Sequence, residues 1–331
     1  MPDRPPVVIA GAGPTGLMCA LGLASQAIPV VVCEAEPSLA HDLRAGSYHP
    51  PTQDMMAKYG ITQRMHLHGL KVRRWQIRER RGGLAAEFDL GLLADVTAYP
   101  YRLHLEQHRL TPIQLDILRR QTDAKVYFGH RVTGFAQKGG KLKVSVESDG
   151  IPGSFEASWL IGADGGRSTV RKLLPIEFEG FTWPEQFLVV STPYDFGKQG
   201  YALNAYVADP VEWVALFKMP NNGPPGVWRV VFPCDPGMPD DALLDTEHVE
   251  AKLQGFHGQG ERYVRQRRAA CVDQVQAMSI RNKRLLEERD PLVQRARMEE
   301  LVATSAETEQ ARAFLLESSM ISGLRKSEAI E

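Results

Sequence analysis

Apolar and polar positions along the first forty residues predict a β-α-β unit. Residues 7–10 (VVIA) and 29–33 (PVVVC) are short apolar runs, typical of strands that are buried on both faces of a parallel sheet. Between them, residues 14–26 carry little charge, which predicts a helix that is buried on most of its sides. Short connections in this order predict parallel strands joined by a right-handed crossover.

The middle of the chain has the pattern of further sheets. Residues 73–105 alternate large apolar and charged side chains and turn at Gly82-Gly83, which predicts a hairpin. Residues 124–161 hold three apolar stretches separated by glycine-rich turns, and these predict three strands. Residues 181–233 are rich in Trp, Tyr, Phe and Val and predict a second sheet.

Helical spacing of apolar residues marks two other regions. Residues 106–120 predict one helix, and residues 261–290 predict a longer helix that stops at Pro291. Shorter helices are expected after it. Gly323 is the one glycine after Glu261, so no further glycine-rich binding loop is expected in this part of the chain.

Length and charge narrow the class of protein. A chain of 331 residues predicts two lobes or one large α/β domain. A net charge of −1 and the lack of a long apolar run argue against nucleic-acid and membrane partners, and the start of the chain lacks the layout of a signal peptide. We therefore expect a cytoplasmic protein. The four cysteines form no CxxC pair and are expected to be reduced: Cys19, Cys33, Cys234 and Cys271.

A glycine pattern between the first strand and helix predicts a dinucleotide site. Gly11 permits a tight turn, Gly13 lets the backbone approach a pyrophosphate, and Gly16 lets helix and strand pack closely. Glu34 ends the second strand, where a carboxylate accepts hydrogen bonds from a ribose diol. An acid at this position favours FAD or NAD over NADP, and it leaves the choice between FAD and NAD open.

Four stretches together resemble a known family. They are GAGPTGL (11–17), LRAGSYHPPTQDMMAKYGI (43–61), EQHRL (106–110) and LIGADGGRSTVRKLL (160–174). They resemble the FAD-dependent aromatic hydroxylases, the single-component flavoprotein monooxygenases related to para-hydroxybenzoate hydroxylase. The resemblance covers most of residues 5–255.

The resemblance implies a set of cofactor-binding residues. Gly11, Gly13, Thr15 and Gly16 match the family's contacts with the FAD pyrophosphate, and Glu34 matches the contact with the adenosine ribose. Arg44 matches a residue near the diphosphate and ribityl chain, and Gln107 matches a further FAD contact. Asp164 and Arg171 belong to the DG stretch, which the family associates with both FAD and the nicotinamide donor. Judged without the family, Arg44 is either an ordinary surface arginine or the cation that a diphosphate requires. Asp164 follows an apolar strand, and it belongs either to a tight turn or to a ligand site at the end of that strand. His49 and His108 are interpreted as a loop residue and a helix-surface residue rather than as an acid or base.

The resemblance also implies the fold and the reaction. The fold is α/β, with a Rossmann-like FAD-binding domain, a second β-sheet substrate domain and C-terminal helices. The expected bounds are 1–72 and 106–175 for the FAD-binding domain, 73–105 and 176–255 for the substrate domain, and 256–331 for the helices. The implied reaction consumes NADH or NADPH, O2 and a phenolic substrate. No metal site is expected, and no catalytic side chain is named.

One family motif is absent, and this leaves alternatives open. Family members carry a Gly-Asp pair and a glycine-rich helix start after the substrate sheet, whereas this chain contains no Gly-Asp dipeptide. A segment is expected to be missing near residues 255–261. The chain is then a hydroxylase in which other residues close the gap, a non-hydroxylating FAD/ADP-binding relic or uncoupled NAD(P)H oxidase, or a reductase without oxygenation. The nearby acids are interpreted as helix caps and solvated charges: Asp240, Asp241 and Asp245.

Overall fold

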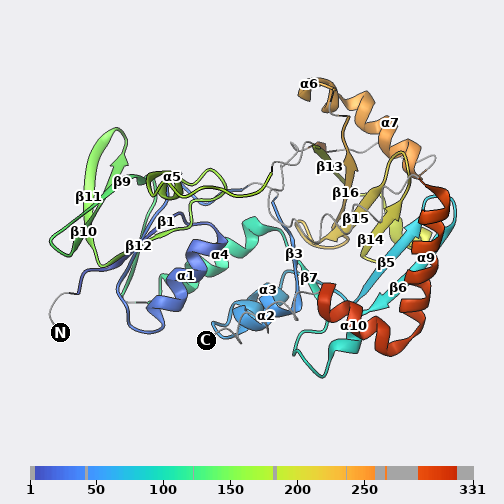
Figure 1. Cartoon of the computed structure of the whole chain (residues 1–331), viewed down its shortest axis with the longest axis horizontal. Coiled ribbons are helices and arrows are strands. Elements are labelled where there is room, and N and C mark those ends of the chain that lie inside the picture. The colour runs from blue at the N-terminus through green and yellow to red at the C-terminus, as the bar shows by residue number, and fades with distance from the viewer. Residues whose placement is uncertain are drawn as a thin grey trace. The chain divides into compact units, whose positions relative to one another are not determined.

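A computed structural model describes the fold as two compact units (Figure 1). The first comprises Met1–Arg44 and Gln107–Phe181, and the second comprises Ala45–Glu106 and Thr182–Glu331. The residues described are 4–41, 44–121, 123–181, 185–235, 237–257, 265–266 and 290–318. Each unit has its own sheets and core, and the predicted α/β fold with C-terminal helices is confirmed.

A four-stranded parallel sheet is the centre of the first unit. Its strand order is β12-β1-β2-β8. The strands are β1 (Val7–Ala10), β2 (Val30–Cys33), β8 (Ala124–Tyr127) and β12 (Trp159–Gly162). Helix α1 (Pro14–Ala24) joins β1 to β2, so the predicted β-α-β unit is confirmed. Both strands are buried along their whole length, as their apolar runs require.

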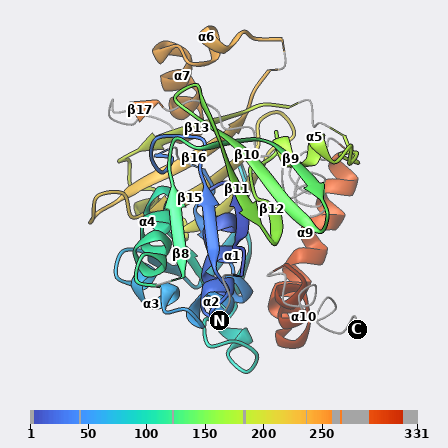
Figure 2. The ribbon, with the colours of Figure 1, turned by 90° about the vertical axis from the view of Figure 1, so that its left-hand side faces the viewer.

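Two layers cover this sheet. Helix α1 packs against α4 (Gln107–Leu118), and an antiparallel sheet packs on the strands with α5 (Thr169–Leu173). Figure 2 shows its three strands, β9 (Arg131–Lys138), β10 (Lys141–Ser148) and β11 (Ile151–Ala157). Val8 and Ala10 of β1 share a core cluster with Val144 of β10 and Val170 of α5.

The prediction of three strands over residues 124–161 is wrong in number. The first apolar stretch divides around Gly129 into β8 and β9, and an additional strand, β11, lies between the second and third stretches. The division at Gly129 places β8 in the parallel sheet and β9 in the antiparallel sheet. Periodicity alone does not reveal that one apolar stretch serves two sheets.

A seven-stranded sheet forms most of the second unit. Its order is β17-β13-β16-β15-β14-β5-β6. The strands are β5 (Arg74–Glu79), β6 (Gly83–Asp89), β13 (Phe187–Thr192), β14 (Asn204–Ala208), β15 (Val214–Met219), β16 (Val227–Pro233) and β17 (Arg265–Gln266). The predicted hairpin is the β5–β6 pair, and the predicted second sheet is confirmed.

Helices cover both faces of the large sheet. On one face, Val249 and Leu253 of α7 (Thr246–His257) share a core with Val230 of β16. On the other, α9 (Pro291–Ala306) and α10 (Thr308–Ser318) pack on β5 and β6, as Figure 1 shows in red. Short α6 (Asp240–Leu243) precedes α7, and Asp245 accepts hydrogen bonds from backbone N–H groups at the start of α7.

A small sheet completes the second unit. Its order is β3-β7-β4, with β3 (Ser47–Tyr48), β7 (Arg102–His104) and β4 (Leu70–Val72). Helices α2 (Pro50–Ala57) and α3 (Ile61–His66) follow β3. Two 3₁₀ helices lie in connections between strands: η1 (Leu90–Leu93) follows β6, and η2 (Phe196–Gln199) lies between β13 and β14.

Several expected bounds differ from the structure. Residues 45–72 belong to the second unit because β3 and β4 pair with β7, and the C-terminal helices pack on that unit's β5–β6 hairpin. Within the predicted helix over 261–290, Arg265–Gln266 form β17, and α9 begins at Pro291. The rest of that helix and most of the expected gap near 255–261 lie outside the described residues.

Candidate functional site

The glycine loop between β1 and α1 is shaped by two glycines that the fold itself requires. Gly11 has φ +101°, and a Cβ there would lie 2.5 Å from the carbonyl oxygen of Ala163. A Cβ on Gly16 would lie 2.0 Å from the carbonyl oxygen of Gly11. Both positions therefore bring backbone segments closer than any side chain permits.

Gly13 is different, because the fold does not require glycine there. Its φ of −68° and ψ of 177° are open to any residue, and a Cβ would meet nothing within 4 Å. It is the N-cap of α1, a helix with no side-chain cap and no acidic residue in its first turn. The space left beside Gly13 and the N–H groups of the helix N-terminus fit a pyrophosphate.

Glu34 connects the loop to the carboxyl end of β2. Its Oε2 accepts a hydrogen bond of 2.7 Å from the backbone N–H of Ala12, and its Oε1 accepts one of 2.9 Å from Glu36. A carboxylate has further lone pairs on both oxygens. Glu34 can therefore hold the loop and also accept hydrogen bonds from a ribose diol.

The DG stretch lies at the carboxyl end of β12. Asp164 accepts a hydrogen bond from the Ser168 hydroxyl and one of 2.7 Å from the backbone N–H of Thr169. Arg171 donates to the carbonyl of Gly166 at 2.9 Å, and its guanidinium lies 4.3 Å from the ring centre of Phe178. Both predicted site residues thus have a structural role in the turn that leads into α5.

These elements meet at one edge of the parallel sheet. Strands β12, β1 and β2 are neighbours, so the glycine loop, Glu34 and Asp164 all follow the carboxyl ends of adjacent strands. Ligands of open α/β sheets bind at this edge. The structure therefore brings together the predicted site residues of the glycine loop, Glu34 and the DG stretch. Thr15 is exposed in the first turn of α1.

Arg44 and Gln107 lie where the chain leaves and re-enters the first unit. Arg44 is exposed, and Gln107 is the first residue of α4. In the adjoining segments, the carbonyl of Gly46 accepts a hydrogen bond of 2.9 Å from Leu105, which extends the β3–β7 pairing. The contacts of Arg44 and Gln107 with FAD stay predictions.

The second unit contains a polar cluster that the sequence analysis did not identify. We name it the polar seam; it consists of Ser47, His49, Arg102 and His104, which come from β3, β7 and the residue after β3. Ser47 pairs with His104 in the small sheet, and Arg102 lies two residues before His104, so their side chains share one face. His104 is fully buried and Arg102 is 4% exposed.

Burial sets the charge state of the two seam histidines. Burial lowers the pKa of His104 to about 4. Burial also lowers the pKa of His49 well below its usual range, and the positive charge of Arg102 lowers it further. His49 lies in a loop as expected, but its Nδ1 is buried. At neutral pH both imidazoles are therefore uncharged.

The sequence did carry one signal for the seam. In the segment YRLHLEQ (101–107), Arg102, His104 and Glu106 alternate with leucines immediately before Gln107. Residues 102–106 are all buried. Alternating polar residues in a strand that is buried on both faces indicate a polar interior site.

Other classes of site receive no support from the described part of the chain. It contains no group of three or more His, Cys, Asp or Glu side chains arranged to hold a metal ion. None of its helices has both the length and the apolar character that a membrane span needs. Three cysteines there are free thiols, Cys19, Cys33 and Cys234, and Cys271 lies outside the described residues.

Two curated relatives are aromatic monooxygenases by name. Para-nitrophenol 4-monooxygenase of Pseudomonas sp. strain WBC-3 is 33% identical over 247 residues, covering 75% of this chain and 59% of the relative. The 6-hydroxy-3-succinoylpyridine 3-monooxygenase of Pseudomonas putida strain DSM 28022 / S16 is 32% identical over 72% of this chain and 60% of the relative. The chain thus spans about three fifths of the length of these relatives.

Solved structures share the fold. The p-nitrophenol 4-monooxygenase of Pseudomonas putida DLL-E4 superposes with a TM-score of 0.82 at 22% identity, covering 95% of this chain and 97% of that chain. A flavin-dependent monooxygenase in complex with FAD and substrate gives 0.71 at 22% identity, over 82% and 50%. The sequence profile of the FAD binding domain matches residues 4–286. The chain therefore belongs to this FAD-binding family. Its resemblance to the FAD-dependent aromatic hydroxylases is confirmed.

Proposed function

We propose that this protein is an FAD-dependent monooxygenase that hydroxylates a phenolic substrate with NADH or NADPH and O2. The observation that carries the proposal is the open glycine loop at the N-terminus of α1, within a chain whose family match spans residues 4–286. The names of two relatives, a nitrophenol and a hydroxypyridine monooxygenase, support an aromatic substrate.

The cofactor is proposed to lie along the carboxyl edge of the first unit's parallel sheet. Its pyrophosphate lies beside Gly13, where no side chain fills the space, and the N-terminus of α1 favours its negative charge. Glu34 accepts from the adenosine ribose. The remaining proposed contacts are Gly11, Thr15, Gly16, Arg44, Gln107, Asp164 and Arg171.

The protein's own contribution is to bind and orient the reactants. FAD, when bound, supplies hydride acceptance and oxygen activation. The glycine loop holds the cofactor's diphosphate, and the large sheet of the second unit presents aromatic side chains to the substrate. Phe217 of β15 is one of these, since it is only half-buried.

The decisive experiment measures whether electron transfer is coupled to hydroxylation. NADH or NADPH oxidation, oxygen uptake, hydrogen peroxide and hydroxylated product are followed together with FAD and a panel of phenols that includes 4-nitrophenol. We expect product formation to account for most of the reduced nicotinamide that is consumed. Quantitative conversion of oxygen to peroxide with every phenol would contradict the proposal and favour the uncoupled oxidase suggested by the absent Gly-Asp motif.

A further inference from the structure

The polar seam faces a row of side chains on the large sheet of the second unit. Strand pairing aligns Asn204 of β14 with Phe217 of β15, and Phe217 with Arg229 of β16, so their side chains lie in one row on the same face. Trp75 of β5 lies beside Asn204 on this face because Gln76 pairs with Ala205.

Contacts join the seam to this row. Arg102 donates a hydrogen bond to Asn204, and its guanidinium lies 4.8 Å from the ring centre of Trp75. The ring of His104 lies 5.9 Å from that of Phe217. The polar seam is therefore an interior layer between the two sheets of the second unit.

Arg102 is a buried cation whose hydrogen-bond partners are neutral. These partners are the amide oxygen of Asn204 and the hydroxyl of Tyr206. No carboxylate in the described part of the chain forms an ion pair with Arg102, and its Nε has no hydrogen-bond partner there. Buried charges are almost always paired. An oxygen atom that accepts a hydrogen bond from Arg102 is the missing partner that the chemistry of this site indicates.

His104 supplies the complementary group. Its Nδ1 lies 2.9 Å from the carbonyl oxygen of Lys218. A carbonyl only accepts, so Nδ1 carries the proton, and Nε2 of the neutral ring is an acceptor. This Nε2 is buried and has no partner among the described residues, and the same holds for the Ser47 hydroxyl and His49 Nδ1.

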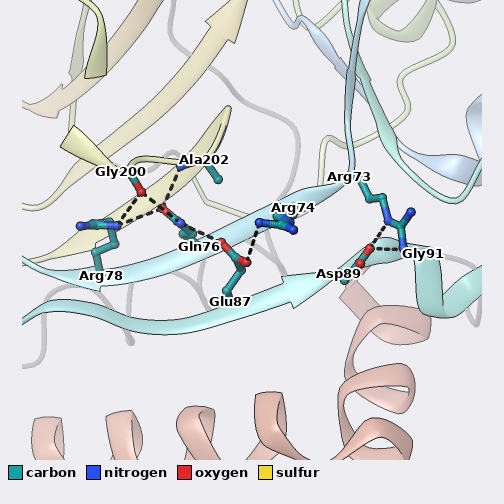
Figure 3. Close-up of polar contacts among 9 residues, drawn as sticks. All are labelled: Arg73, Arg74, Gln76, Arg78, Glu87, Asp89, Gly91, Gly200 and Ala202. Atoms are coloured by element: carbon teal, nitrogen blue, oxygen red, sulfur yellow. Dashed lines mark hydrogen bonds and ion pairs between the residues drawn. The ribbon is translucent and has the colours of Figure 1, made fainter. Parts of the chain in front are cut away.

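A neighbouring side chain shows how this fold satisfies a purely structural polar group. Gln76 follows Trp75 in β5 and so points to the opposite face of the sheet. Its amide donates to Glu87 at 2.8 Å and to Gly200, and its oxygen accepts from Ala202 at 2.8 Å and from Arg78 (Figure 3). Buried polar groups in proteins are normally satisfied in this way. The seam departs from that pattern at several adjacent atoms.

We propose that the polar seam binds the phenolic oxygen of the aromatic substrate, with Arg102 donating to that oxygen and His104 Nε2 accepting from its hydroxyl group. The inference rests on the proposed function and deepens it, because it assigns the residues that recognise the hydroxyl. Phe217, beside His104, offers an aromatic surface to the attached ring. An aromatic compound without a hydroxyl has no hydrogen to donate to His104 Nε2 and no phenolic oxygen to accept from Arg102.

The test compares two ligands that differ in one hydroxyl group. Calorimetric titration gives the Kd of 4-nitrophenol and of nitrobenzene for the FAD-loaded protein. We expect Arg102→Gln to weaken 4-nitrophenol binding about ten- to hundredfold, the range for hydrogen bonds to a charged group, and to leave nitrobenzene binding unchanged. Arg74→Gln is the matched control, since its side chain is 66% exposed on the same sheet.

A second variant keeps the test decisive if Arg102→Gln does not fold. Arg102→Lys retains the charge but loses the planar guanidinium, so it should weaken 4-nitrophenol less and still reduce the preference over nitrobenzene. If both Arg102 variants keep the preference for 4-nitrophenol, the proposed role of the polar seam is refuted, and the proposed function is not. A wild-type protein that bound neither compound would refute both the seam and the proposed function.

Discussion

The two units hold their candidate ligand sites in opposite ways. In the first unit, the groups that face the proposed pyrophosphate are backbone N–H groups of one short loop. The charged side chains around this loop, Glu34 and Asp164, already have hydrogen-bond partners. In the second, side chains from distant parts of the sequence meet between two sheets, and several of their polar atoms have none among the described residues. A site made of backbone groups in one loop is formed by consecutive residues, so it can be recognised in the sequence. A site made of side chains from distant segments depends on how the strands pair.

The largest expected effect is on FAD binding, and it distinguishes a glycine needed for the ligand from a glycine needed for folding. Gly13→Val places a side chain where the pyrophosphate is proposed to lie, in a backbone conformation that valine adopts readily. We expect FAD binding to be abolished while the melting temperature of the apoprotein stays unchanged. FAD fluorescence titration and thermal denaturation measure the two effects.

Gly16→Val is the matched contrast to that variant. Its side chain would meet the backbone of Gly11, so it should destabilise the apoprotein itself. Equal loss of stability in the two variants would contradict the distinction between the two glycines.

A smaller effect is expected at the edge of the first unit. Arg44→Ala removes a proposed charge-assisted hydrogen bond to FAD and should weaken binding by about 1.5–3 kcal/mol, roughly ten- to hundredfold. Because Arg44 is exposed, its loss should change the melting temperature of the holoprotein more than that of the apoprotein. An equal change in both would mark Arg44 as structural.

The smallest expected effect concerns the pH dependence of stability. Burial lowers the pKa of His104 to about 4, while its unfolded pKa is about 6.5. Between these values the unfolded chain binds a proton that the folded chain does not, so stability falls as pH falls from about 6.5 toward 4. From pH 7.5 to 5.5 this costs about 1.3 kcal/mol of unfolding free energy.

Urea unfolding at the two pH values tests this assignment. His104→Gln should lose less stability on acidification than the wild type, by about the same 1.3 kcal/mol. The matched control is His68→Gln, which replaces an exposed histidine by the same residue. A wild-type pH dependence that His104→Gln preserves would show that the ring is not buried in its neutral form.

The sequence predicted the first site far better than the second, for a physical reason. The strand, loop, helix and acid of residues 7–34 are local, so one apolar pattern and three glycines describe them. The seam requires Ser47 to pair with His104, and Arg102 to reach Asn204, a residue 102 positions away. No local pattern encodes such pairings. The same limit explains why one apolar stretch was not recognised as two strands of different sheets.

We propose a division of roles in which the first unit binds the cofactor and the second recognises the substrate. The most direct test titrates FAD into the wild type, Gly13→Val and Arg102→Gln proteins under identical conditions, with flavin fluorescence as the signal. We expect the wild type and Arg102→Gln to bind one FAD with the same Kd and Gly13→Val to bind none. FAD binding by Gly13→Val with the wild-type Kd, or its loss in a folded Arg102→Gln protein, would show that the two units do not divide the roles in this way.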